Sequence, residues 1–271
     1  MKKLSSFILA LVLLASLTIP ALAQTTVKLG YVGEALSVPW QPVIEKLAAE
    51  GVTLKLIPFT DYPQPNRALA EKEIDLNSFQ HYAFLNKEIA NFGYELTVIG
   101  DTLIAPLGLY SRKIKSVSEI KDGDKIAIPS DATNGGRAIK LLETAGLLKV
   151  DPAAGFVPEK ADITEYVVKV DIIEVEAALT ASLLPDVIAS IINGAHAVDN
   201  GFVPANDAIF LEQAGGTTNN PYVNVLVART EDKDNPLYLK ILEYYHSPEV
   251  AEILATDLKG AFIPAWDVNA K

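Results

Sequence analysis

The segment TNGGR, residues 133–137, has the composition of an anion-binding turn. Backbone N–H groups at a helix start attract anions, glycines permit close approach, and Arg137 offers a two-pronged donor that matches a carboxylate. The segment is not a phosphate-binding loop, because the G-x-x-x-x-G-K-[ST] pattern is absent from the chain. We interpret it as a carboxylate clamp and include Asn134 among the candidate ligand-binding residues. The alternative is an ordinary capping turn with a solvated arginine.

A second group of candidates is aromatic. Six ring-bearing side chains fall within 26 positions: Phe59, Tyr62, Phe79, His81, Tyr82 and Phe84. At the ends of the expected strands they would line a pocket for an apolar side chain, with His81 as a polar contact at the rim. Each of them is equally compatible with a place in the hydrophobic core, since large aromatics dominate protein interiors.

Two asparagines complete the set of candidates. Asn193 and Asn224 each stand at or near the end of an expected strand, among apolar residues. An asparagine in such a place must satisfy both a donor and an acceptor, and the ammonium and carboxylate groups of a ligand would do this. The alternative is a satisfied contact with the backbone.

Signals for catalysis are weak. His81, His196 and His246 lie far apart and form neither an H-x-x-x-H nor an H-E-x-x-H pattern. There is no G-x-S-x-G nucleophile elbow, and no spacing marks two acids as a paired acid and base. The sequence therefore predicts a binding protein rather than an enzyme, with no metal site and no cofactor.

The elements that would position these residues alternate between strand and helix. Strands are expected at residues 27–33, 52–59, 74–79, 96–102, 125–129, 171–175, 187–192 and 222–229, and helices at residues 40–50, 66–72, 137–145, 177–184 and 248–258. Such alternation predicts an α/β fold with mainly parallel sheets flanked by helices, whose ligands collect at the carboxyl ends of the strands.

The alternation forms two series, which predicts two lobes. We expect lobe I to comprise residues 24–106 and 226–271, and lobe II to comprise residues 107–225. The chain would then cross between the lobes twice. This arrangement is a hinged clamshell with its ligand cleft at the lobe boundary.

Composition excludes several classes of protein. The 271 residues include 23 Lys and Arg against 34 Asp and Glu, a net charge of −11, which has the wrong sign for binding nucleic acid. Cysteine is absent, which excludes disulfides, thiolate metal sites and cysteine nucleophiles. At 49% hydrophobic residues, the chain can build its stability from a buried core.

The first 23 residues have the layout of a secretory signal peptide. Lys2 and Lys3 precede an apolar run at residues 7–17, and the small-residue sequence PALA follows at residues 20–23. We expect cleavage after Ala23. The alternative is a membrane anchor, but the run is shorter than the ~20 residues that a spanning helix needs. The mature protein is expected to be soluble and acidic, and to lie outside the cytoplasm.

Several segments together resemble the methionine-binding lipoproteins of bacterial ABC uptake systems, the NlpA type of substrate-binding protein. The match rests on the order and spacing of FTDYPQPN (59–66), FQH (79–81), PLGLYS (106–111), IAIPSDATNGGR (126–137), ING (192–194), PYVN (221–224) and GAFIP (260–264). The resemblance implies a periplasmic-binding-protein clamshell that captures methionine and delivers it to an ABC permease at the inner membrane.

The resemblance also implies roles for individual residues. Arg137 would grip the carboxylate of the amino acid, and Asn193 and Asn224 would hold its polar groups. The thioether side chain would lie among the rings of Tyr62, Phe79 and His81.

The sequence departs from the family pattern in four places. It has no cysteine for a lipid anchor, so we expect a freely soluble periplasmic or secreted monomer without a lipobox. Phe84 stands where relatives commonly have tyrosine, which removes a hydroxyl near the ligand. GEALSVP (33–39) replaces a G-P-H-A-E loop, and NGAHA (193–197) replaces N-G-N-Y-A. Another apolar amino acid or a short methionine-containing peptide is therefore an alternative ligand, and an enzyme or a surface adhesin on this scaffold is an alternative function.

Overall fold

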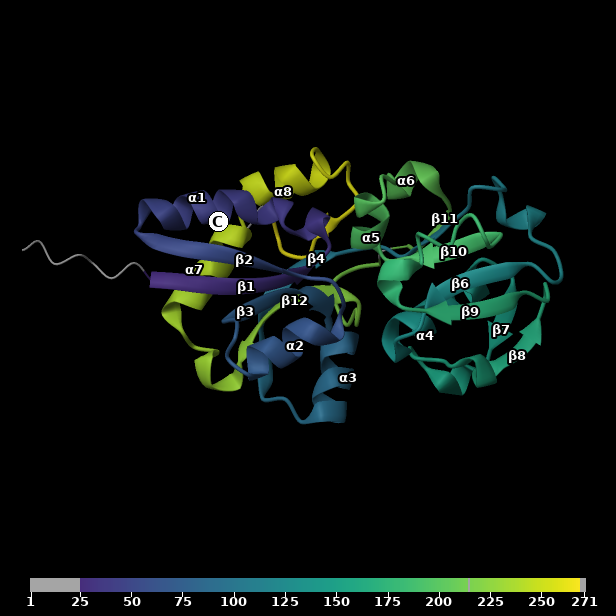
Figure 1. The fold of residues 1–271 in the computed structure, drawn as a ribbon, viewed down its shortest axis with the longest axis horizontal. Helices are drawn as coiled ribbons and strands as arrows, with labels where there is room; N and C mark the ends of the chain where they lie inside the picture. Colours follow the sequence, from purple (N-terminus) through teal and green to yellow (C-terminus); the bar gives the residue numbers. More distant parts are fainter. Residues whose placement is uncertain (1–24, 214, 269–271) are drawn as a thin grey trace, which may run out of the picture.

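A computed structural model of the chain describes residues 25–213 and 215–268. The predicted signal peptide, residues 1–23, lies outside the described residues. The fold consists of two α/β lobes placed side by side along the long axis of the molecule (Figure 1). The predicted two-lobed α/β clamshell is confirmed. The sheets are mixed rather than mainly parallel, because β12, β13, β5 and β11 all pair with antiparallel neighbours.

Lobe I is built on a six-stranded sheet in the order β13-β4-β12-β3-β1-β2. Strand β1 pairs in parallel with β2 and β3, whereas β12 is antiparallel to both β3 and β4. The strands are β1 (Thr25–Val32), β2 (Val52–Phe59), β3 (Leu76–His81), β4 (Leu96–Ile104), β12 (Val223–Arg229) and β13 (Ile263–Pro264). The helices of this lobe are η1 (Glu34–Leu36), η2 (Val38–Trp40), α1 (Gln41–Ala49), α2 (Pro63–Ala70), α3 (Tyr82–Phe92), η7 (Thr230–Asp232), α7 (Pro236–Tyr245) and α8 (Pro248–Ala255).

Lobe II is built on a five-stranded sheet in the order β11-β5-β10-β6-β9, with a small hairpin of β7 and β8 beside it. Strand β6 is parallel to β9 and β10, and β5 is antiparallel to β10 and β11. The strands are β5 (Gly108–Tyr110), β6 (Lys125–Pro129), β7 (Leu148–Val150), β8 (Ile163–Tyr166), β9 (Asp171–Val175), β10 (Ala189–Ile192) and β11 (Ala208–Leu211). The helices are α4 (Ala132–Thr144), α5 (Gly194–Asp199) and α6 (Pro204–Asp207), with short 3-10 turns η3 (Val117–Glu119), η4 (Pro152–Ala154), η5 (Lys160–Asp162) and η6 (Ala177–Leu179).

The chain passes between the lobes twice. It leaves the first sheet after β4 and enters the second at β5, and it returns between β11 and β12. The exact lobe boundaries stay a prediction. The expected boundary after residue 225 falls inside β12, whose whole length belongs to the first sheet, so the second crossing comes before Val223.

Two of the expected helices differ from those in the structure by more than three residues. Helix α4 begins at Ala132 rather than at residue 137, because the Asp131 side chain caps it by accepting from the Asn134 N–H. The expected helix at residues 177–184 is only the short η6 followed by turns. The hydroxyls of Thr180 and Ser182 bond to nearby backbone carbonyls in this segment, which competes with helix formation.

Each lobe has its own hydrophobic core. One large cluster of buried side chains packs against the sheet of lobe I and includes the rings of Trp40 and Tyr245, whose centroids lie 4.4 Å apart with their planes tilted by 38°. A second cluster packs against the sheet of lobe II. Separate cores let each lobe keep its own structure, so the boundary between them is a natural place for a ligand.

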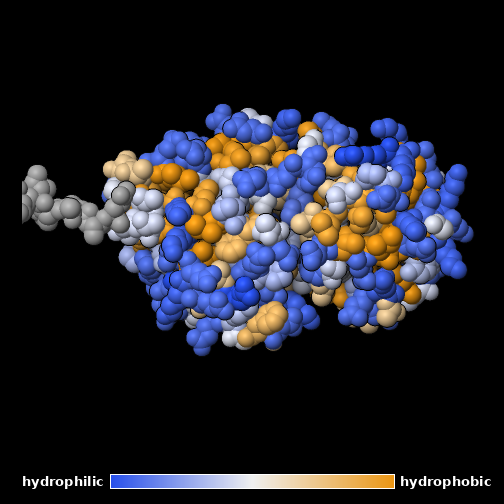
Figure 2. Space-filling model, in the orientation of Figure 1, coloured by the Kyte–Doolittle hydropathy of each residue, from blue (hydrophilic) through white to orange (hydrophobic). Residues whose placement is uncertain are grey.

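On the face of the molecule seen in Figure 2, hydrophilic residues surround areas of hydrophobic residues on both lobes. A few large apolar side chains are exposed, among them Phe92 and Phe156. Within residues 25–213 and 215–268, no helix has the length and apolar character required to cross a bilayer.

Candidate functional site

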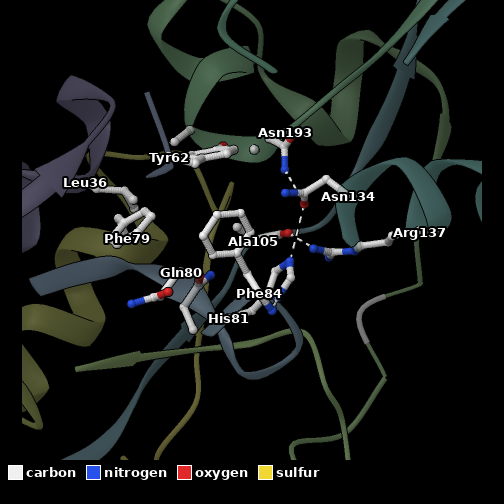
Figure 3. A pocket seen from close by; sticks show the side chains of 13 residues that line it. Leu36, Tyr62, Phe79, Gln80, His81, Phe84, Ala105, Asn134, Arg137 and Asn193 are labelled. Carbon is white, nitrogen blue, oxygen red and sulfur yellow. Dashed lines mark hydrogen bonds between the residues drawn. The ribbon is translucent and has the colours of Figure 1, made fainter. Parts of the chain in front are cut away.

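A pocket of about 430 Å³, part of it open to solvent, lies between the lobes. Eight of the ten residues that the sequence nominated contribute to its lining: Tyr62, Phe79, His81, Phe84, Asn134, Arg137, Asn193 and Asn224. Phe59 and Tyr82 do not line it, and both pack against hydrophobic clusters of lobe I instead. Leu36 and Tyr62 lie on one side of the pocket, and Asn134, Arg137 and Asn193 lie on the other (Figure 3). The structure thus brings these eight candidates together, while their contacts with a ligand stay a prediction.

The carboxyl ends of the strands position most of these side chains. Phe79 and His81 lie in the second half of β3, and Phe84 follows in the first turn of α3. Asn193 comes directly after β10, and Arg137 extends from α4, which follows β6. The site therefore forms where parallel strands of this fold class usually hold their ligands.

The aromatic side of the pocket is a packed cluster. The Tyr62 ring lies 6.0 Å from that of Phe79 and 5.9 Å from that of Phe84, measured between centroids. The ring of His196 lies 5.3 Å from that of Tyr62. Phe79 and Phe84 also belong to the core of lobe I, so the same two rings line the pocket and pack in the core. Their packing fixes the apolar wall in one shape.

A hydrogen-bonded network forms the polar side of the pocket. His81 Nδ1 accepts from the Phe84 N–H at 3.1 Å, so the ring proton is assigned to Nε2, which donates to Asn134 Oδ1 at 3.3 Å. Asn193 Nδ2 donates to the same oxygen at 2.8 Å. The amide of Asn134 in turn donates to Asp131. The network orients Asn134 and joins the two lobes through His81.

One acceptor in this network has no partner. Asn193 Oδ1 is buried and accepts no hydrogen bond from the described part of the chain. A buried acceptor without a partner costs about 1–3 kcal/mol. A ligand that brings an N–H donor to this oxygen would recover that free energy.

Arg137 is buried, with 3% of its side chain exposed, but its guanidinium is already paired. Nε donates to Glu212 Oε1 at 2.8 Å and Nη2 donates to Glu212 Oε2 at 2.5 Å. Nη2 also donates to the carbonyl oxygen of Ala105 at 3.0 Å. The two-pronged donor face is thus directed to Glu212 in this structure, and the expected grip of Arg137 on a ligand carboxylate stays a prediction. Among the described residues Nη1 has no hydrogen-bond acceptor.

The two glycines of the TNGGR segment serve packing rather than ligand approach. A Cβ on Gly135 would lie 2.9 Å from the carbonyl oxygen of Pro129, and a Cβ on Gly136 would lie 2.7 Å from Cα of Val157. Both contacts are with the backbone, which cannot move aside easily. The helix start is capped by Asp131, so the anion at this turn belongs to the chain itself.

Replacing Gly136 with alanine is expected to lower the free energy of unfolding by about 1 to 2 kcal/mol, because the added methyl group collides with backbone. Thermal unfolding followed by circular dichroism measures this as a fall of a few degrees in Tm. Gly216→Ala is the matched control, since nothing lies within 4 Å of the added Cβ there. Equal melting temperatures for the two variants would contradict the expectation.

Burial lowers the pKa of His81 to about 3, and the nearby charge of Arg137 acts in the same direction. Burial also lowers the pKa of His196. His81 is therefore neutral near neutral pH, as its assigned tautomer requires. In the unfolded chain the same ring binds a proton near pH 6.5.

Because only the unfolded state takes up this proton, stability is expected to fall as the pH drops below about 6.5. His81→Asn removes the titrating ring and keeps a good helix cap. Between pH 7 and pH 5 the variant should lose less stability than the unsubstituted protein, by up to about 2 kcal/mol. Urea unfolding at both pH values measures the difference. Identical losses would show that His81 does not carry this pH dependence.

Sequence inspection missed some residues of the site. Leu36, Gln80, Ala105, Gly194 and Ala195 also line the pocket, and Glu212 pairs with Arg137 behind it. Gln80 and Gly194 lie inside the FQH and ING segments, which already pointed to the right positions. Glu212 has no local signal, because it is 75 positions from Arg137 in the sequence. Across residues 25–213 and 215–268, no three potential ligands from His, Asp and Glu gather into a metal site.

Curated relatives cover most of the chain. Outer membrane lipoprotein 3 of Mannheimia haemolytica is 41% identical over 226 residues, 83% of this chain and 84% of the relative. The D-methionine-binding lipoprotein MetQ of Salmonella typhimurium is 38% identical over 228 residues, 83% of each protein.

Solved structures resemble the whole two-lobed fold. A nutrient binding protein from Burkholderia cenocepacia bound to methionine is 37% identical, with a TM-score of 0.81 over 89% of this chain and all of the other. A structure of the methionine binding protein MetQ is 34% identical, with a TM-score of 0.83 over 89% of this chain and 98% of the other.

The comparisons contradict the expected location. The relatives are named lipoproteins, a class of protein attached to a membrane through lipid. These names contradict the prediction of a freely soluble protein without a lipid anchor. The 271 residues of this chain nevertheless include no cysteine. A sequence model of one family, described as NlpA lipoprotein, matches residues 27–266. The chain belongs to the NlpA lipoprotein family.

Proposed function

We propose that this protein captures methionine in the pocket between its lobes and delivers it to an ABC importer. The observation that carries the proposal is the unpartnered acceptor Asn193 Oδ1 in the same pocket wall as Arg137, opposite a cluster of aromatic rings. An amino acid with an apolar side chain has matching parts: a donor, an anion and an apolar group. The methionine named for the Burkholderia structure supports this ligand.

Each part of methionine has a partner in the pocket. Its ammonium group donates to Asn193 Oδ1, with Asn224 as a second polar contact. Its carboxylate accepts from Nη1 of Arg137, the N–H group that Glu212 leaves free. Its thioether lies against Tyr62, Phe79 and Phe84, where sulfur makes favourable contacts with aromatic rings.

The ionisable groups of the pocket are suited to holding a ligand rather than transforming it. Burial lowers the pKa of His81 to about 3 and raises the pKa of Tyr62 above its usual range. Neither group exchanges protons near neutral pH, so neither is tuned for acid or base catalysis there. We therefore assign a transport role without a covalent step. The names of the relatives, which describe binding, support this assignment.

Isothermal titration of the purified protein tests the proposal, preceded by native mass spectrometry to detect any ligand carried through purification. The panel contains L- and D-methionine, leucine, norleucine and methionine-containing dipeptides. Methionine is expected to bind at micromolar Kd or tighter, about −8 kcal/mol or better. A panel in which leucine or a dipeptide binds more tightly would reassign the ligand, and no binding by any member would overturn the proposal.

A further inference from the structure

Glu212 controls the electrostatics of Arg137 from outside the pocket. Both of its carboxylate oxygens accept from the guanidinium, at 2.8 and 2.5 Å. The second oxygen also accepts from the Leu107 N–H at 2.9 Å, and the Glu212 N–H donates to the Leu107 carbonyl at 2.9 Å. The carboxylate is thus anchored to the strand segment beside the first lobe crossing and holds one fixed position.

The Arg137 guanidinium lies between Glu212 and the pocket. Arg137 lines the pocket whereas Glu212 does not, and Glu212 instead lines two outer cavities together with Arg137 and Tyr222. The Tyr222 ring lies 4.3 Å from the guanidinium carbon and covers one face of the group. Arg137 is therefore held in place by Glu212, Ala105 and Tyr222. Nη1 is the guanidinium nitrogen that can donate to a ligand.

The pairing also cancels charge. The positive charge of Arg137, with 3% of its side chain exposed, meets the negative charge of Glu212, with 18% exposed. Interactions between charges in such a buried place are stronger than in water, because there is less solvent to screen them. A ligand in the pocket therefore meets a nearly neutral ion pair rather than an isolated cation.

We propose that Glu212 is a specificity-determining residue, which makes the site select zwitterionic amino acids over anionic analogues of the same shape. The inference rests on the proposed capture of methionine at this pocket. Without the Glu212 charge, the pocket would hold an uncompensated cation. Such a pocket attracts any carboxylate and repels the ammonium group that an amino acid also carries.

Three thioether ligands with the same side chain but different charges test this proposal. Methionine is a zwitterion, 4-(methylthio)butanoate lacks the ammonium group, and methioninol lacks the carboxylate. Titration calorimetry, with competition against methionine for weak ligands, gives Kd for each. In Glu212→Gln the ratio of Kd for methioninol to Kd for 4-(methylthio)butanoate should rise about tenfold or more. Glu165→Gln, which breaks an exposed ion pair with Lys149 in the same lobe, should leave the ratio unchanged.

A purely structural role for Glu212 would weaken all three ligands alike and leave the ratio unchanged, which would overturn the proposal. A folded E212Q protein that binds none of the three would overturn it too, since charge selection requires an intact site. If E212Q does not fold by circular dichroism, Glu212→Asp keeps the charge and must keep the unsubstituted ratio, and a changed ratio overturns the proposal. Failure of the unsubstituted protein to bind methionine would instead reject the proposed function itself.

Discussion

Replacing Arg137 with alanine is expected to weaken methionine binding about 100-fold or more. The substitution removes the buried donor assigned to the ligand carboxylate and leaves the Glu212 carboxylate, with 18% of its side chain exposed, without its partner. Removing one member of a hydrogen-bonded buried charge pair typically costs about 2–5 kcal/mol in binding. Isothermal titration with methionine measures the loss as a change in Kd.

Arg137→Lys is the matched variant for this prediction. Lysine keeps the positive charge but cannot form the two-pronged contact with Glu212 or the stacking contact with Tyr222. Its affinity should fall between those of the alanine variant and the unsubstituted protein. Circular dichroism and Tm confirm that each variant is folded. If a folded R137A protein binds methionine within threefold of the unsubstituted affinity, Arg137 is not a ligand-binding residue.

The elements most accurately predicted from the sequence are those with strong local patterns. The expected strands at residues 52–59, 125–129 and 171–175 coincide with β2, β6 and β9. Strands β2 and β6 are largely apolar and bounded by turn residues, whereas β9 is marked by its three β-branched residues, Ile172, Ile173 and Val175. Where such local signals are strong, tertiary structure has little to change.

Helix α4 shows how local propensity misleads. Two consecutive glycines, Gly135 and Gly136, argue against helix by propensity, yet both lie inside α4. Their lack of a side chain lets the helix approach the backbone of Pro129 and Val157. The favourable packing outweighs the propensity cost, and no feature within the segment reveals the partner against which it packs.

Long-range pairs account for the rest of what the sequence could not predict. The sequence nominated Asn193, Asn134 and His81 one by one. It could not show that Asn134 Oδ1 accepts hydrogen bonds from both of the others, each more than 50 positions away. Glu212 lies even farther from Arg137 in the sequence, and no motif around it marks it as a partner of Arg137. A single carboxylate in an acidic chain reveals its partner only once the fold is known.

The contact between η1 and α5 explains a further local feature, the glycine at position 33. Gly33 has φ of +87°, a conformation that favours glycine. A Cβ there would also lie 3.0 Å from Cβ of Ala195 and 3.1 Å from Oδ2 of Asp199. The glycine lets the turn after β1 in lobe I meet α5 in lobe II closely. The lobes therefore touch directly at this edge of the pocket.

Asp199 holds this contact together. Its two carboxylate oxygens accept from the backbone N–H groups of Glu34 and Ala35, at 3.0 and 2.8 Å. These donors start η1, so a residue of one lobe caps a helix of the other. Opening the cleft would break both hydrogen bonds. Asp199 thus stabilises the arrangement in which Leu36 of lobe I and Ala195 of lobe II both line the pocket.

Asp199→Ala is expected to weaken methionine binding about 10- to 30-fold, although Asp199 does not line the pocket. The substitution removes the two hydrogen bonds from Glu34 and Ala35 that favour the closed arrangement of the lobes. Small-angle scattering should show a larger radius of gyration without ligand and the unsubstituted value at saturating methionine. Asp186→Ala, at an exposed position of the same lobe, is the control. Unchanged affinity and unchanged scattering in D199A would mean that these two hydrogen bonds do not govern closure, and that the network of His81 and Asn134 holds the lobes together.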